Sequence, residues 1–150
     1  MKSLKWAFLA FTLFAFTLNS CKKSASNKPA VTNSIALKFN GTAYSTSTIT
    51  AAYKSGALQI IGSYVGGTTL YLAIPGNVKV GSFDLSTGAG AATFSTGPSA
   101  SFFSDSGSIV ITSFTSTTVA GTFSFHGTDL TTSGTCTVTE GTFQATYATQ

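Results

Sequence analysis

Ionisable side chains that could carry out chemistry are few after residue 33. His126 is the only histidine and the one candidate general base, and Asp129 follows it three residues later. Serine is abundant, but no Gly-x-Ser-x-Gly elbow presents one as a nucleophile. Gly88-Ala89-Gly90 lacks the third glycine, the helix and the lysine of a phosphate-binding loop, and Asp105-Ser106-Gly107 lacks the repeated oxygen ligands of a calcium loop. We therefore predict no catalytic, cofactor or metal site, and a protein that is not an enzyme.

Cys21 has the most informative surroundings of any residue that could react. Lys2 and Lys5 precede the uncharged run 6–18, and small Ser20 stands directly before the cysteine, as in a cleaved secretory signal. The run is shorter than the about 20 apolar residues of a membrane-spanning helix.

This leader resembles a bacterial lipoprotein signal, although Asn19 departs from the small residue usual two positions before the cysteine. A thiol is the nucleophile that can form a thioether, and the resemblance implies diacylglycerol on Cys21, which cleavage leaves as the N-terminus. Two or three acyl chains make such an anchor stable. The alternative is an ordinary secretory signal in which Cys21 is incidental.

The positive charge of the chain lies near its beginning. Five of the eight lysines precede residue 34, whereas residues 34–150 carry three lysines and four carboxylates, a net charge of −1. A nucleic-acid-binding face is therefore not expected. We predict a signal peptide at 1–20, the lipidated cysteine and a flexible polar tether at 21–33, and one domain at 34–150, a common size for a domain with its own core.

The apolar residues after residue 33 alternate with polar ones in short runs broken by glycine, which predicts strands. We expect an all-β fold, an antiparallel sandwich or barrel of about nine or ten short strands. Asn40-Gly41 is a hairpin turn because both residues tolerate positive φ, and 44–53 should return along the first strand. Further turns are expected at Lys54-Ser55-Gly56 and Asp105-Ser106-Gly107.

Two segments are less regular. A strand is expected over 78–85, and 86–97, rich in Gly, Ala, Ser and Thr, should be a mobile loop or a ragged edge anchored by Phe94. Near the end, the apolar residues lie at even-numbered positions before Glu140-Gly141 and at odd-numbered positions after it. This change calls for either a tight turn or a β-bulge. Cys136 lies in an alternating run and is expected to be a small buried hydrophobe.

Aromatic side chains leave one route to ligand binding that needs no ionisable groups. Most should fill the core, but Tyr53 and Tyr64 stand next to turns and are expected to be the more exposed pair. Such rings could stack on sugars or hold an apolar ligand.

The last third of the chain carries a resemblance to a family. Gly121-Thr122-Phe123-Ser124-Phe125 and the later run 137–143 resemble the C-terminal pattern of a family of uncharacterised small lipoproteins from Bacteroidota, and 40–44 is similar to its first hairpin. The resemblance covers about 34–150 and implies no functional residue.

The chain as a whole is therefore expected to be a lipid-anchored envelope protein with a non-enzymatic binding or structural domain. The alternative is a carbohydrate- or ligand-binding module. Its partners would be the membrane, through the acyl chains, and an envelope protein or glycan. Similar Bacteroidota proteins that are sent to the cell surface usually carry an acidic stretch just after the cysteine, where this chain has Lys22-Lys23, so we expect an outer-membrane protein that faces the periplasm.

Overall fold

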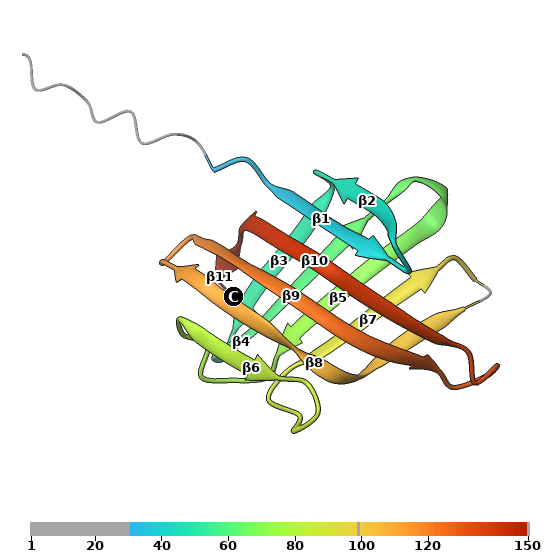
Figure 1. Ribbon diagram of the computed structural model, residues 1–150. Helices are drawn as coiled ribbons and strands as arrows, with labels where there is room; N and C mark the ends of the chain where they lie inside the picture. Colours follow the sequence, from blue (N-terminus) through green and yellow to red (C-terminus); the bar gives the residue numbers. More distant parts are fainter. Residues whose placement is uncertain (1–30, 99, 150) are drawn as a thin grey trace, which may run out of the picture.

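The computed structural model describes residues 31–98 and 100–149, which form eleven strands and one short 3₁₀ turn at Val65–Gly67 (Figure 1). The strands are β1 (Ser34–Phe39), β2 (Thr42–Thr46), β3 (Ile49–Lys54), β4 (Ala57–Ser63), β5 (Thr68–Ile74), β6 (Gly81–Asp84), β7 (Ala91–Thr96), β8 (Ser101–Phe114), β9 (Thr118–Asp129), β10 (Thr135–Thr146) and β11 (Ala148–Thr149). The predicted all-β class is confirmed.

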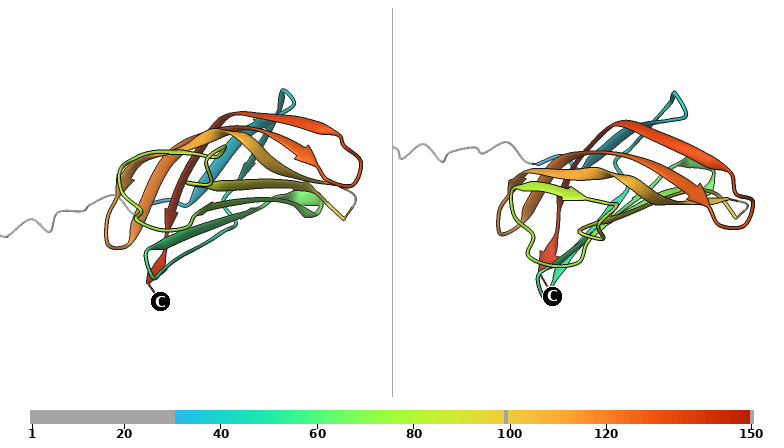
Figure 2. Two further views of the ribbon diagram at one scale, coloured as in Figure 1. Left: turned by 90° about the horizontal axis from the view of Figure 1, so that it is seen from below. Right: turned by 60° about the horizontal axis from the view of Figure 1, so that its bottom comes forward.

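All eleven strands belong to one sheet, with the order β11-β3-β4-β5-β7-β8-β9-β10-β1-β2, while β6 pairs with a further stretch of β8. Every pairing is antiparallel except that of β11 with β3. The sheet curls into a half-barrel, as Figure 2 shows, rather than splitting into the two facing layers of a sandwich.

Turn residues set the register of the first two hairpins. Asn40 and Gly41 have φ of 47° and 82°, which suits a two-residue hairpin whose twist matches its strands. Phe39 then faces Thr42, and β1 and β2 pair without a break. Ser55 and Gly56 do the same between β3 and β4, with φ of 51° and 84°. Both turns were predicted correctly.

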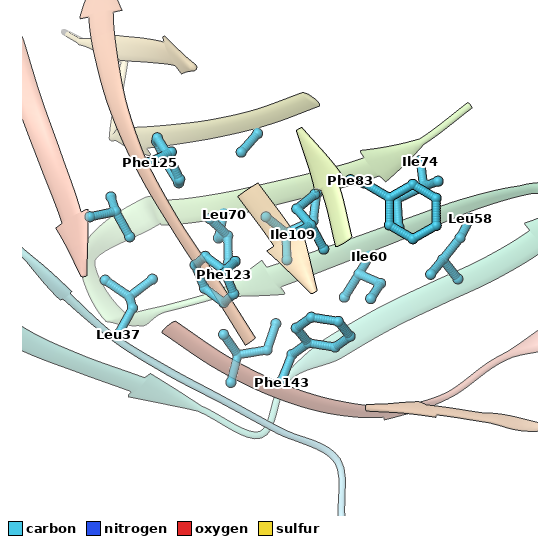
Figure 3. Close-up of a cluster of buried hydrophobic side chains, with 14 of the residues drawn as sticks. Leu37, Leu58, Ile60, Leu70, Ile74, Phe83, Ile109, Phe123, Phe125 and Phe143 are labelled. Atoms are coloured by element: carbon cyan, nitrogen blue, oxygen red, sulfur yellow. The ribbon is translucent and has the colours of Figure 1, made fainter. Parts of the chain in front are cut away.

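The core fills the inside of the curl (Figure 3). Alternate residues of each strand point inward, because side chains of a strand alternate between its two faces. In β5 these are Leu70, Leu72 and Ile74, all at most 2% exposed. The space between Leu58, Ile60, Ile109 and their neighbours has no room for a water molecule. This part of the interior is therefore closely packed.

Two strands differ in their bounds from those predicted from the sequence. The segment 44–53 is not one strand along β1: β2 ends at Thr46 and β3 begins at Ile49, which pairs with β4. The bend between them is held by the hydroxyl of Thr46, which donates to the carbonyl of Ser63 at 2.6 Å. The strand expected over 78–85 is shorter, since only Gly81–Asp84 pairs with β8.

The expected loop at 86–97 is wrong in its second half. Residues 91–96 form β7, an inner strand that pairs with β5 on one side and β8 on the other. Phe94 is fully buried, as expected of its anchor. The small side chains of 91–96 do not predict a strand from the sequence. The segment forms one because it pairs with β5 and β8.

Asp105-Ser106-Gly107 is not a turn but lies inside the 14-residue strand β8. Ser104 faces Gly127 and Ser106 faces His126, so Asp105 is an extra residue with no partner, a β-bulge. Gly107 absorbs the distortion with a φ of 116°. A Cβ there would lie 2.2 Å from the carbonyl oxygen of Ser124, so no larger residue fits.

The Glu140-Gly141 alternative resolves in favour of a bulge. Val138 pairs with Phe125 and Gly141 with Phe123, so one residue of β9 faces two of β10. Glu140 adopts a φ of 52°. The bulge explains how Val138 and Phe143 both point into the core although their numbers differ in parity.

Tyr147 connects β10 to β11, which lies at the far end of the strand order. It follows β10, which lies next to β1, and leads directly into β11, which pairs with β3. Its hydroxyl donates to the carbonyl of Thr115, and its ring stacks on Phe114 with centroids 5.7 Å apart. The last strand thus holds the half-barrel together.

Candidate functional site

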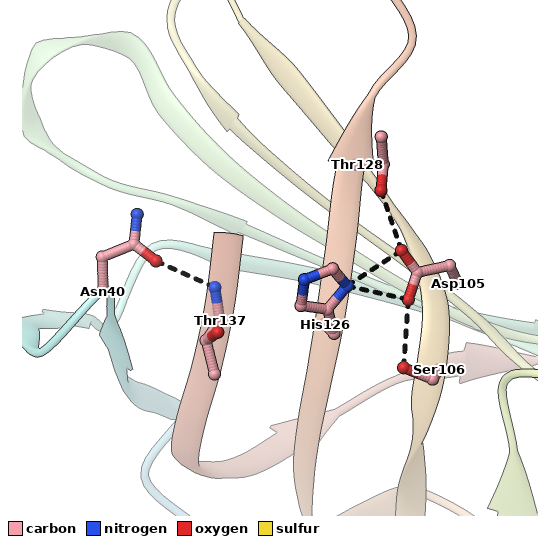
Figure 4. A network of polar contacts seen from close by, with 6 residues as sticks. All are labelled: Asn40, Asp105, Ser106, His126, Thr128 and Thr137. Atoms are coloured by element: carbon pink, nitrogen blue, oxygen red, sulfur yellow. Dashed lines mark hydrogen bonds and ion pairs between the residues drawn. The ribbon is translucent and has the colours of Figure 1, made fainter. Parts of the chain in front are cut away.

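A polar network on the outer face of β8 and β9 contains the candidate base His126. Its Nδ1 lies 2.9 Å from Oδ2 and 3.0 Å from Oδ1 of Asp105, the bulge residue of β8 (Figure 4). Thr128 Oγ1 donates to Oδ2 at 2.8 Å, and Ser106 Oγ donates to Oδ1 at 3.0 Å. The bulge brings the carboxylate opposite the histidine.

Asp105 is the centre of this network, and the side chains of Asp105 and His126 are both 44% exposed. Hydrogen bonds from Thr128 and then from His126 lower the pKa of Asp105. The pair resembles the base and orienting acid of a hydrolase, but Ser106 bonds to the aspartate and not to the histidine. Its geometry is that of a surface clamp between two strands.

Asp129, the carboxylate next to His126 in sequence, takes no part in this network. It lies on the inner face, 1% exposed, because residues three apart on a strand point to opposite faces. Its Oδ1 accepts hydrogen bonds from the amide and hydroxyl of Thr131 and from the amide of Thr132. These bonds, led by the Thr131 hydroxyl, lower the pKa of Asp129 to about 2. The alternation of the strand was the signal that sequence reasoning missed.

The other two carboxylates also make contacts within the fold. Asp84 accepts from the amide and hydroxyl of Ser86 at the end of β6. Glu140 forms an ion pair with Lys38 of β1, with Nζ 2.7 Å from Oε1. All four carboxylates of the sequence thus bind neighbouring strands or close turns.

Tyr53 and Tyr64 do not form an exposed pair. Tyr64 is only 9% exposed, which corrects the expectation, because its ring lies against Phe94 and Tyr44. Tyr53 is half-buried in a different cluster, with ring centroids 5.4 Å from Phe114 and 5.7 Å from Tyr147. Two separate clusters cannot serve as one stacking platform.

Cys136 is a free cysteine, 2% exposed, among the core side chains. Burial raises the pKa of its thiol, so the thiolate is disfavoured. The expectation of a small buried hydrophobe is confirmed.

Two shallow hollows lie on the outer face, one on each side of Glu140. One of about 480 Å³ is lined by short side chains of β8, β9 and β10, among them Ser108, Thr122 and Thr142. The other, of about 260 Å³, lies over β1 and β2, beside Lys38 and Ala43. The sequence offered no signal for either, since their side chains come from strands far apart in the chain.

The lipidation candidate Cys21 lies outside the described residues. Within 31–98 and 100–149 no helix is both long and apolar enough to cross a membrane, and no three metal-ligating side chains gather in that same part of the chain.

Fold and surface together define an all-β half-barrel whose four carboxylates make contacts within its own fold. The chain belongs to the family described as Domain of unknown function (DUF6252), whose model matches residues 31–146. That match covers the whole of β1 to β10. The comparisons with curated proteins and with solved structures gave no match.

Proposed function

We propose that this protein is a lipid-anchored component of a bacterial cell envelope, attached through Cys21, with the half-barrel as a non-enzymatic binding or spacing domain. The observation that carries the proposal is the leader: two lysines, an uncharged run over 6–18, and Ser20 directly before Cys21. This order is typical of a processed export signal, and the thiol of Cys21 is the group that would be acylated.

The arrangement of charge supports the proposal. Lys22, Lys23 and Lys28 lie between Cys21 and the domain, whereas the domain itself is nearly neutral. A basic segment beside the acyl chains would lie against anionic lipid headgroups and add to the anchor. A near-neutral domain has no comparable attraction and would stand free of the surface.

The structure of the domain supports a role in binding or spacing more than in catalysis. Each carboxylate makes contacts within the fold, and His126 is paired with Asp105 on the outer face of β8 and β9. The core is packed, so a partner would be met on the outer face. For the membrane side we propose the periplasmic face of the outer membrane, because Lys22 and Lys23 stand where lipoproteins exported to the cell surface usually carry acidic residues.

Metabolic labelling with a fatty acid tests the anchor, with one variant for each cysteine of the chain. Wild type and Cys136→Ala should both take up label, whereas Cys21→Ser should take up none. The mass of the mature protein should correspond to residue 21 as the N-terminus plus acyl groups. Label that persists in Cys21→Ser would refute the anchor. Protease treatment of intact cells tests the orientation: digestion of the domain would place it on the cell surface and contradict the periplasmic assignment.

A further inference from the structure

Strand β2 (Thr42–Thr46) is an open edge of the sheet. It pairs with β1 on one side, and it stands last in the strand order. In the described part of the chain no other strand pairs with it. The hairpin of β1 and β2, coloured blue to teal, projects from the curled sheet in Figure 2. An edge of this kind presents unpaired backbone N–H and C=O groups to another strand.

The edge also lacks the features that usually block such pairing. Proteins protect edges with charges, prolines, bulges or covering segments. β2 has neither charge nor proline, and its register with β1 is unbroken. The other edges are better protected: β11 covers part of β3 at Ala52 and Tyr53, and β6 is a short strand that ends in Asp84.

The sequence of β2 is nearly the same read in either direction, Thr-Ala-Tyr-Ser-Thr. An antiparallel pairing of two copies about a two-fold axis at Tyr44 sets Thr42 opposite Thr46, Ala43 opposite Ser45, and Tyr44 opposite itself. Aromatic pairs and threonine pairs are favourable across strands, and no like charges meet. A two-fold interface requires this kind of self-complementarity.

We propose that two copies of this chain associate by antiparallel pairing of β2 with β2, which joins their half-barrels into one continuous sheet. The proposal is independent of the anchor at Cys21.

Both faces of β2 suit this arrangement. Tyr44 points to the inner side, where its ring lies 5.6 Å from that of Phe94, so the two Tyr44 side chains would extend the apolar side. Ala43 and Ser45 are exposed on the outer side, beside the hollow of about 260 Å³. Small side chains at both positions leave room for the opposing strand.

The pairing should be weak and concentration-dependent. Two strands of five residues bury far less than the roughly 1,200–2,000 Å² of a stable interface. The contact consists of backbone hydrogen bonds and of the Thr–Thr, Ala–Ser and Tyr–Tyr pairs across the two strands. Substitutions at two positions should therefore be enough to abolish it.

Introducing like or opposite charges at two positions on the outer face of β2 tests the proposal in cells. Two copies of the full chain, with different tags at the C-terminus, are co-expressed, fixed briefly with formaldehyde and co-purified. Wild-type copies should co-purify. Ala43→Lys/Ser45→Lys sets lysine against lysine twice, and co-purification should fall about tenfold, as two repulsive cross-strand pairs would require. Mixing that variant with Ala43→Glu/Ser45→Glu should restore it.

Thr122→Lys/Ser124→Lys is the matched control, because these exposed residues have the same spacing on β9, which is flanked by β8 and β10. It should co-purify like wild type, and circular dichroism should show that all variants remain folded. The proposal fails if wild-type copies do not co-purify, if Ala43→Lys/Ser45→Lys co-purifies as wild type does, or if the mixed pair does not recover. Fatty-acid labelling of the same cells reports separately on Cys21.

Discussion

The imidazole of His126 and the carboxylate of Asp105 meet across two neighbouring strands, with Nδ1 2.9 Å from Oδ2, and the aspartate reaches this position because it is the extra residue of a bulge in β8. Bulges redirect side chains in this way. The bulge in β10 does the same for Glu140, which meets Lys38 of β1. Each bulge thus provides a polar link between strands on the outer face.

Asp105→Asn should destabilise the protein in a pH-dependent manner. Hydrogen bonds lower the pKa of Asp105 in the folded state, so its contribution is present above the pKa of the unfolded chain, about 4, and is lost as the pH falls through the folded pKa. The melting temperature of the variant should lie below that of wild type at pH 7, and the difference should shrink below about pH 4. A difference that is the same at pH 7 and pH 3 would contradict the assigned role.

Gly121→Ala should be one of the most damaging single substitutions. A Cβ at Gly121 would lie 2.2 Å from the carbonyl oxygen of Val110 and 2.6 Å from the ring of Phe143, so strand or ring must move. We expect a loss of roughly 2–4 kcal/mol in unfolding free energy, measured in urea. Gly76→Ala is the control, because nothing lies within 4 Å of its Cβ position. Equal stability of the two variants would disprove the close packing.

Tyr147→Phe isolates the hydrogen bond at the closure of the sheet. The hydroxyl donates to the carbonyl of Thr115, and its removal should cost about 1 kcal/mol. Tyr53→Phe serves for comparison, since it keeps the same aromatic cluster; it should unfold at nearly the wild-type urea concentration. A loss in Tyr53→Phe as large as that in Tyr147→Phe would show that the Thr115 bond is not the cause.

Glu140→Gly should leave stability unchanged or raise it, although it removes an ion pair. The left-handed backbone of Glu140, with a φ of 52°, costs a residue with a Cβ about 1–2 kcal/mol. An exposed ion pair contributes only about 0–1 kcal/mol, and Lys38→Ala should confirm that small value. Urea unfolding of both variants gives the comparison. A clear loss in Glu140→Gly would mean that the link to β1 outweighs the backbone strain.

Local sequence signals predicted the class of the fold and its tightest turns. Asn40-Gly41 and Ser55-Gly56 are short-range features, because positive φ at two successive positions is a property of the residues themselves. The buried alternation of Val119, Phe123 and Phe125 in β9 followed from the period of a strand. These parts needed no knowledge of the partner strands.

The rest depended on contacts between distant strands. Asp-Ser-Gly has the same local chemistry in a turn and in a bulge, and only the pairing of β8 with β9 selects the bulge. β7 has no large alternating residues except Phe94, yet two neighbours hold it in the sheet. The partner of His126 lies 21 residues away, and register alone brings it there. By contrast, the inward orientation of Asp129 could have been deduced from strand parity.

The pairing of β1 with β10 has a consequence for how the chain can fold. Ser34 pairs with Gln144 and Phe39 with Val138. The side of β1 that does not pair with β2 therefore has no partner strand until β10 has been made, near the end of synthesis. Loop closure over such a separation is slow compared with local hairpin formation. The early strands must therefore wait, unpaired on one side, for the last dozen residues, and a chain cut short before Tyr147 would lose the closure of its sheet as well as its end.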